Sequence, residues 1–65
     1  MSANPGKSSW PELVGLTATQ IAQDRPDVAV EVLPQGAPLM PDYNPRRVRV
    51  FLDLYGIVAK IPVIG

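Results

Sequence analysis

The sequence predicts a small α+β domain in which one short helix packs on a small β-sheet. Three segments support this class: a helix signal at residues 17–25 and alternating apolar patterns at 28–33 and 47–52. A chain of 65 residues suffices for one domain, and 46% hydrophobic residues is typical of a folded chain. We expect residues 10–65 to form the domain and the polar residues 1–9 to form a flexible tail without a signal peptide.

The helix is predicted to begin at Thr17, because Gln20 follows three residues later with the spacing of a capping box. Pro26 ends it, since the residue before a proline is pushed out of the helical conformation. A helix of about two turns does not persist alone in water. Its apolar side chains are therefore expected to pack against the sheet, namely Leu16 and Ile21 with Ala18 or Ala22.

Two segments alternate as half-buried strands do. Residues 28–33 carry valine at every second position, which predicts a strand with Val28, Val30 and Val32 on one face. In residues 47–52, three apolar side chains point one way, whereas Arg47, Arg49 and Phe51 point the other. Two arginines thus lie side by side on the outer face. After a turn at residues 54–56, the apolar residues 57–64 predict a short edge strand, because they contain Pro62.

The composition excludes several classes of function. Cysteine and histidine are both missing, so the chain offers no disulfide, thiol nucleophile, imidazole base or soft metal site, and no cofactor is expected. A formal net charge of zero argues against nucleic acid or an anionic membrane as the partner. An enzyme is disfavoured, because no evident cleft shifts the pKa of the available carboxylates, which are Glu12, Asp24, Asp27, Asp42 and Asp53.

Residues 34–46 form a long connection between the two strands. A connection of this length without periodic structure is usually functional or disordered. Its four prolines restrict the backbone, so we expect a stiff, extended and exposed loop. Leu39, Met40 and Tyr43 are typical of a binding surface, although Leu39 or Met40 could instead fold back onto the core.

Asp42 lies near the crest of this loop, above the arginines of the second strand. Its carboxylate could accept charge-assisted hydrogen bonds from Arg47 and Arg49, which would hold the loop in one shape without a disulfide. The alternative is that Arg46, Arg47 and Arg49 form only a solvated face.

Five sequence blocks occur in an order and spacing that are specific when taken together: Ser9–Gly15, Asp24–Pro26, Val32–Gly36, Arg47–Phe51 and Ile61–Gly65. With them, the chain from Lys7 to Gly65 resembles the potato inhibitor I family of serine protease inhibitors. The resemblance implies a mixed sheet with a central parallel strand pair, one helix packed on it, and a long exposed reactive loop. It also implies a monomer whose partner is a subtilisin-like or chymotrypsin-like serine endopeptidase.

The register of the loop follows from counting forward from Gly36 and back from Arg47. Both counts place the family's scissile bond between Pro41 and Asp42. The resemblance then implies that the protease contacts Pro38, Leu39, Met40, Tyr43 and Asn44. It implies that the loop is supported by Arg47, Arg49 and Gly65.

The chain departs from the family pattern at the reactive bond. Pro41 stands where the family generally carries Leu or Met, and proline lacks the backbone N–H used in substrate-like binding. Inhibition of common subtilisin-like or chymotrypsin-like enzymes should therefore be weakened. A second register, with Met40 as the specificity residue, is disfavoured by both counts. The alternative function is a non-inhibitory binding module with the same fold.

Overall fold

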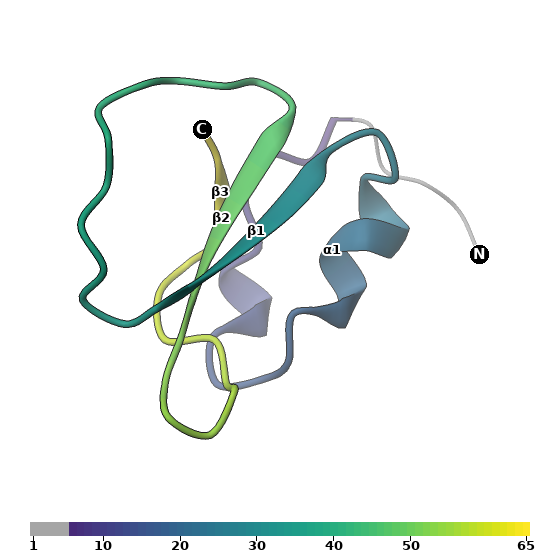
Figure 1. The fold of residues 1–65 in the computed structure, drawn as a ribbon. Coiled ribbons are helices and arrows are strands. Elements are labelled where there is room, and N and C mark those ends of the chain that lie inside the picture. The colour runs from purple at the N-terminus through teal and green to yellow at the C-terminus, as the bar shows by residue number, and fades with distance from the viewer. Residues whose placement is uncertain (1–5) are drawn as a thin grey trace.

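The protein is described by a computed structural model, in which the structure of residues 6–65 is described. Its elements are a 3-10 helix η1 (Pro11–Leu13), α1 (Thr19–Asp24), β1 (Ala29–Pro34), β2 (Arg47–Leu52) and β3 (Val63–Ile64). The strands form one sheet of order β1-β2-β3, in which β1 and β2 are parallel and β2 and β3 antiparallel. One helix packs on this sheet (Figure 1), so the predicted α+β class and its central parallel pair are confirmed. No helix within residues 6–65 is long and apolar enough to cross a membrane.

The hydrophobic core lies between α1 and the sheet. Trp10, Ile21, Val48 and Val50 are fully buried, and Leu13 and Val58 complete the cluster. The indole Nε1–H of Trp10 donates a hydrogen bond of 3.0 Å to Asp24, which satisfies the one polar group of the ring. β2 is therefore the central strand of the fold, and its predicted apolar face is buried as expected.

The valine face of β1 is only partly buried. Val28 and Val30 pack against the core, whereas Val32 on the same face is 55% exposed. The reason is length. A helix of 6 residues spans about 9 Å, whereas a strand of 6 residues spans about 20 Å, so α1 cannot cover the whole of β1.

The start of α1 differs from the prediction. The helix begins at Thr19 with Ala18 as N-cap and no side-chain cap, and the Thr17 hydroxyl lies 3.3 Å from the Thr19 hydroxyl. The predicted capping box is therefore wrong. The N–H of Gly15 donates to the Val58 carbonyl, and the N–H of Val58 donates to the Leu16 carbonyl, at 2.9 and 2.8 Å.

This pairing with Val58 holds the chain in a non-helical course just before α1. Leu16 lies on this segment. Its side chain is 54% exposed and does not pack on the sheet as predicted. Of the two alanines proposed as further packing residues, Ala18 lies against the core and Ala22 is exposed. The helix ends at Asp24, shortly before Pro26, as predicted.

β3 is the short strand predicted near Pro62, and it pairs with the first half of β2. Its other edge is covered by the N-terminal segment. Ser9 forms a bridge with Val63, and the N–H of Ile64 donates to the Ser8 carbonyl at 2.9 Å. This pairing differs from the flexible tail predicted over residues 1–9, of which residues 1–5 lie outside the described part of the chain.

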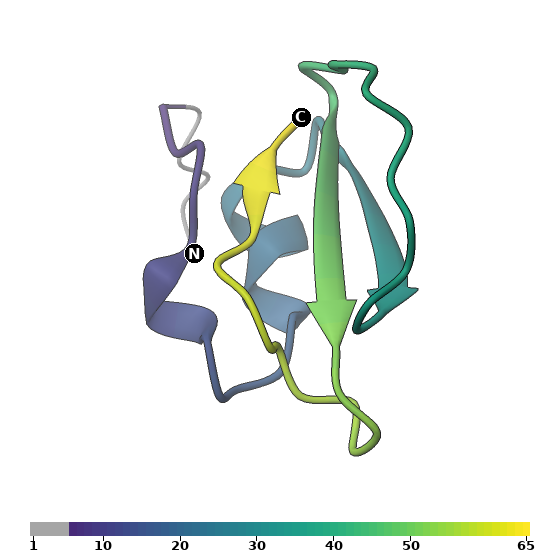
Figure 2. The same cartoon turned by 90° about the vertical axis from the view of Figure 1, so that its left-hand side faces the viewer.

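The parallel pairing of β1 and β2 determines the course of residues 35–46. Because the strands run in the same direction, these residues must return along the whole sheet, a distance of about 20 Å. Fully extended, such a connection reaches about 40 Å. The surplus length bows away from the strands on the side opposite α1 (Figures 1 and 2).

Candidate functional site

The loop of residues 35–46 exposes nearly all of its side chains. Leu39, Met40 and Tyr43 are 48%, 73% and 74% exposed, and neither Leu39 nor Met40 belongs to the buried cluster. The alternative in which these side chains fold onto the core is therefore not observed. The other exposed residues for which the resemblance implies a role are Pro38, Pro41, Asp42 and Asn44. Exposed apolar side chains gathered on one segment are typical of an interaction site.

Arg47 and Arg49 reach from β2 into this loop. Arg49 donates from Nη1 to the Met40 carbonyl at 3.2 Å and from Nη2 to Asp42 Oδ1 at 3.0 Å. Arg47 donates from Nη2 to the Asp42 carbonyl at 2.6 Å and from Nη1 to Asp42 Oδ2 at 3.4 Å. We call these two residues the arginine pair. They lie two positions apart on one strand, so they share one face of the sheet.

The arginine pair holds the chain on both sides of the Pro41–Asp42 peptide bond. Arg49 contacts Met40 before the bond and Asp42 after it, and Arg47 adds two contacts to Asp42. Both arginine side chains are only 15% exposed, whereas that of Asp42 is 61% exposed. Guanidinium–carboxylate contacts of this kind are stronger than neutral hydrogen bonds. The loop is thus held from below at its centre.

Two further residues hold the arginine pair in position. Glu31, which lies opposite Arg49 in the β1–β2 register, accepts a hydrogen bond of 3.1 Å from Arg49 Nε. The Gly65 carbonyl accepts a hydrogen bond of 2.7 Å from Arg47 Nε, and the Gly65 N–H donates a hydrogen bond of 2.8 Å to the Arg47 carbonyl. Glu31 is not among the residues predicted from the sequence to support the loop. Its place on the polar face of residues 28–33 is visible in the sequence. Its pairing with Arg49 follows only once the register between β1 and β2 is known.

The backbone at Pro41 forms a tight turn. The N–H of Asp42 donates a hydrogen bond of 2.8 Å to the Met40 carbonyl. This bond spans Pro41 and is the pattern of a γ-turn. The Met40 carbonyl therefore accepts two hydrogen bonds, one from Asp42 and one from Arg49. Within residues 6–65, no hydrogen bond reaches the Pro41 carbonyl. That oxygen is left available for an external donor.

Both ends of the loop are also closed by hydrogen bonds. At its start, the N–H of Gln35 donates to the Leu52 carbonyl, and Gly36 adopts a positive φ of 87° that favours glycine. At its end, Asn44 Oδ1 accepts a hydrogen bond of 2.9 Å from the N–H of Arg46, as in an Asx turn. The loop is therefore fixed at its start, centre and end.

The arginine pair also favours the ionised form of the Asp42 carboxyl. Hydrogen bonds from Arg49, and next from Arg47, lower the pKa of the Asp42 carboxyl below its ordinary value. The pKa of Arg49 is raised in turn, chiefly by the hydrogen bond to Asp42. Asp42 is therefore ionised at neutral pH, and its charge is matched by the guanidinium groups beneath it.

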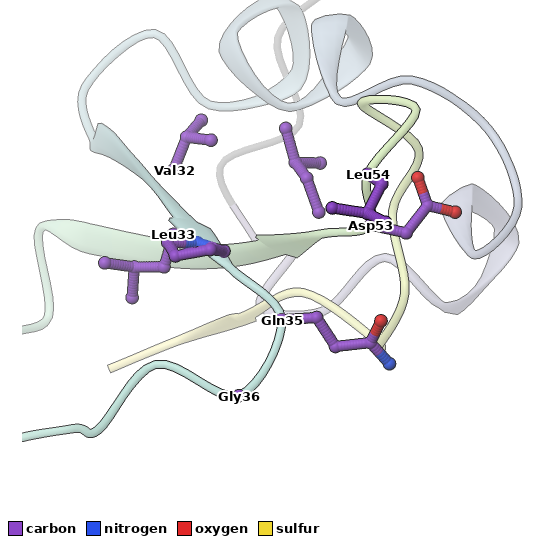
Figure 3. Close-up of a pocket in the computed structure, with 8 residues that line it drawn as sticks. Val32, Leu33, Gln35, Gly36, Asp53 and Leu54 are labelled. Atoms are coloured by element: carbon purple, nitrogen blue, oxygen red, sulfur yellow. The ribbon is translucent and has the colours of Figure 1, made fainter.

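A hollow of about 470 Å³ lies at the other end of the strand pair, beside the first loop residues (Figure 3). Its lining is mostly apolar and comes from the ends of β1 and β2 and the turn that follows: Val32, Leu33, Pro34, Gln35, Gly36, Leu52, Asp53 and Leu54. Asp53 is its one carboxylate, and Asp53 Oδ1 accepts hydrogen bonds from the N–H groups of Tyr55 and Ile57 in its own turn. The hollow therefore carries no catalytic pair.

The remaining carboxylates considered for acid–base chemistry also have structural partners. Glu12 pairs with Lys7, and Asp27 with Arg25, whose hydrogen bond lowers the Asp27 pKa to about 2. Asp24 accepts from Trp10 and from Gln20. Within residues 6–65, no group of three or more metal-ligating side chains is found.

Comparison with known proteins agrees with these features. A sequence profile described as "Potato inhibitor I family" matches residues 2–65. Subtilisin inhibitor 1 of Phaseolus angularis is 45% identical over 65 residues, covering 94% of this chain and 71% of that protein. A chymotrypsin inhibitor of Lumbricus terrestris is 46% identical over 63 residues, covering 91% and 73%. The crystal structure of bitter gourd trypsin inhibitor matches with a TM-score of 0.84 at 40% identity, covering 98% of this chain and 100% of that one.

Proposed function

The chain belongs to the potato inhibitor I family, and on that premise we propose that it inhibits a serine endopeptidase through a substrate-like loop whose reactive bond is Pro41–Asp42. The observation that carries this proposal is the arginine pair, which holds the chain on both sides of that bond. The relatives support the class of target, since they are named as inhibitors of subtilisin, chymotrypsin and trypsin. We expect a monomer that binds one protease molecule.

Tight binding follows from the restricted freedom of the loop. A flexible segment loses conformational entropy when it is ordered in an active site, and this loss weakens the complex. Here the prolines restrict the backbone in the free protein, and the hydrogen bonds at the start, centre and end of the loop hold its shape. Most of the contact energy is then available for affinity.

Slow turnover follows from the same contacts. If the protease cuts the Pro41–Asp42 bond, Met40 stays bound to Arg49 and Asp42 stays bound to both arginines. The new amine and the acyl group therefore remain near each other, and religation competes with release of the product. The loop behaves as a substrate that leaves the active site slowly.

The backbone geometry favours Pro41–Asp42 over Met40–Pro41 as the reactive bond. A serine protease stabilises the oxyanion that forms on the carbonyl of the attacked residue with its own donors. The Met40 carbonyl already accepts hydrogen bonds from Asp42 and Arg49, whereas the Pro41 carbonyl accepts none from residues 6–65. Pro38, Leu39 and Met40 would then contact the protease before the bond, and Tyr43 and Asn44 after it.

The proposal is tested by measuring inhibition constants against subtilisin, chymotrypsin and elastase. The Pro41→Leu variant should bind subtilisin at least about tenfold more tightly than the wild type, because leucine restores both an N–H donor and a side chain for a deep pocket. Leu54→Ala serves as the control, since Leu54 is fully exposed at the far end of the sheet. If neither the wild type nor Pro41→Leu slows any of the three enzymes, the proposal is wrong.

The alternative is a non-inhibitory binding module, and Pro41 at the reactive position is the observation that favours it. A timed digestion with subtilisin separates the two functions. An inhibitory loop should resist cleavage or be cut slowly at one position, whereas a loop that has lost inhibition should be cut rapidly at several. Mass spectrometry of the fragments identifies the bond.

A further inference from the structure

We propose, resting on the inhibitory function proposed above, that the target is a serine endopeptidase that cleaves after proline. Pro41 is exposed in the centre of the loop, immediately before the reactive bond. The ring at this position weakens binding to enzymes with a deep primary pocket, but it is the natural substrate side chain for a proline-specific enzyme. The departure from the family pattern then acts as a specificity determinant.

The first argument is the set of polar groups that the loop offers to a protease at the bond. Pro41 has no N–H, and the neighbouring Asp42 N–H is already bonded to the Met40 carbonyl. The free polar group at the bond is therefore the Pro41 carbonyl. An enzyme that pairs its own acceptor with the N–H of the primary residue leaves that acceptor unsatisfied here, which weakens binding by about tenfold to a hundredfold.

A proline-specific enzyme does not suffer this loss. Its substrates also lack the N–H, so its active site is not built to need that donor, and its primary pocket fits a short, rigid ring. Specificity is a difference of affinities between partners, and both effects act in the same direction. The loop should thus prefer a post-proline enzyme over a subtilisin or a chymotrypsin.

The flanking residues define the rest of the target surface. Leu39 and Met40 are 48% and 73% exposed and apolar, so they suit an apolar groove on the side before the bond. On the side after the bond, the Asp42 carboxylate is bound to the arginine pair rather than left free. With Glu31 also paired to Arg49, the region beneath the bond is formally neutral. The partner therefore needs an apolar groove on the side before the bond.

The test compares three enzymes: a post-proline-specific serine endopeptidase that digests intact proteins, subtilisin and chymotrypsin. We expect the wild type to inhibit the post-proline enzyme at least about tenfold more tightly than the other two. Pro41→Leu should reverse this order, and Pro41→Ala, which restores the N–H without a large side chain, should weaken binding to the post-proline enzyme. Thermal melts establish that the variants are folded, and Leu54→Ala should leave all three constants unchanged.

The outcomes separate this inference from the inhibitory function itself. If Pro41→Leu inhibits subtilisin but the wild type does not inhibit the post-proline enzyme, the inference is wrong and the inhibitory function stands. Equal inhibition of all three enzymes by the wild type, or its rapid digestion after Pro41 by the post-proline enzyme, also overturns the inference. If no form inhibits any enzyme, the inhibitory function fails and the inference fails with it.

Discussion

The two faces of β2 differ in what they stabilise. On one face, Val48 and Val50 are fully buried in the core cluster that also contains Ile21 of α1. On the other, the arginine pair reaches into the exposed loop and contacts Met40 and Asp42. The apolar face stabilises the fold, and the charged face stabilises the shape of the loop. The fold and the shape of the loop thus depend on different residues of one strand, so we expect that each can be lost without the other.

The largest expected effect is on folding, from Val50→Ala. Removing the two methyl groups and leaving a cavity should lower the free energy of unfolding by about 2–3 kcal/mol. At this chain length, the melting temperature should fall by about 10 °C or more. Calorimetry measures this, and Val32→Ala on the exposed part of β1 is the matched control, with an expected change under about 0.5 kcal/mol.

Inhibition by Val50→Ala, measured well below its melting temperature, should stay close to that of the wild type. A loss of inhibition without a fall in melting temperature would show that the two faces do not divide the roles in this way.

The next effect is on the loop, from Arg49→Ala. This substitution removes the contacts that reach both sides of the proposed reactive bond, so inhibition should weaken by at least about tenfold and cleavage at Pro41–Asp42 should accelerate. The melting temperature should change little. Arg46→Ala is the matched control, because no side-chain hydrogen bond of Arg46 occurs within residues 6–65. Equal effects of the two substitutions would contradict a special role for Arg49.

The pH dependence of loop order tests the same contacts without deleting an arginine. Because the folded loop lowers the Asp42 pKa, its support should be complete above the ordinary value of 3.8 and lost as the pH falls through the lowered value. NMR relaxation of the amides of residues 39–43 should therefore show a mobile loop only at acidic pH. In Asp42→Asn, the loop should lack this transition. A transition between pH 5 and 7 in the wild type would point to another group.

The smallest effect is expected from Glu31→Gln. Glu31 positions Arg49 but is itself 46% exposed in its side chain, so the inhibition constant should rise only about two- to threefold. Glu12→Gln removes the carboxylate of a different surface ion pair and should leave the constant unchanged. A tenfold loss from Glu31→Gln would mean that the position of Arg49 depends on β1 far more than on the loop.

Local sequence patterns predicted the parts of this molecule in which neighbouring residues decide the structure. The alternation of residues 47–52 assigned Val48 and Val50 to the core, and the prolines indicated an exposed loop above the arginines. Phe51, assigned to the outer face, is nevertheless largely buried, and Lys60 Nζ lies 4.9 Å from its ring centroid. Alternation gives the face on which a side chain lies, but not what covers that face.

The parts that the sequence did not predict depend on contacts between distant segments. The pairing of Val58 with Gly15 and Leu16 overrode the local signal for a helix start at Thr17. The role of Glu31 required the parallel register of β1 and β2. The Asp42 N–H and Arg49 both donate to the Met40 carbonyl and leave the Pro41 carbonyl free. The spacing of residues in the sequence does not predict this choice between the two carbonyls.

Religation of the cut inhibitor tests the central claim most directly. The chain is cleaved at Pro41–Asp42 by the protease that it binds most tightly, and the cut form is then incubated with a catalytic amount of the same enzyme. If the arginine pair holds both new ends, mass spectrometry should show intact chain reappearing until cut and intact forms coexist. Fragments that separate, or a cut form that never regains the Pro41–Asp42 bond, would contradict the account.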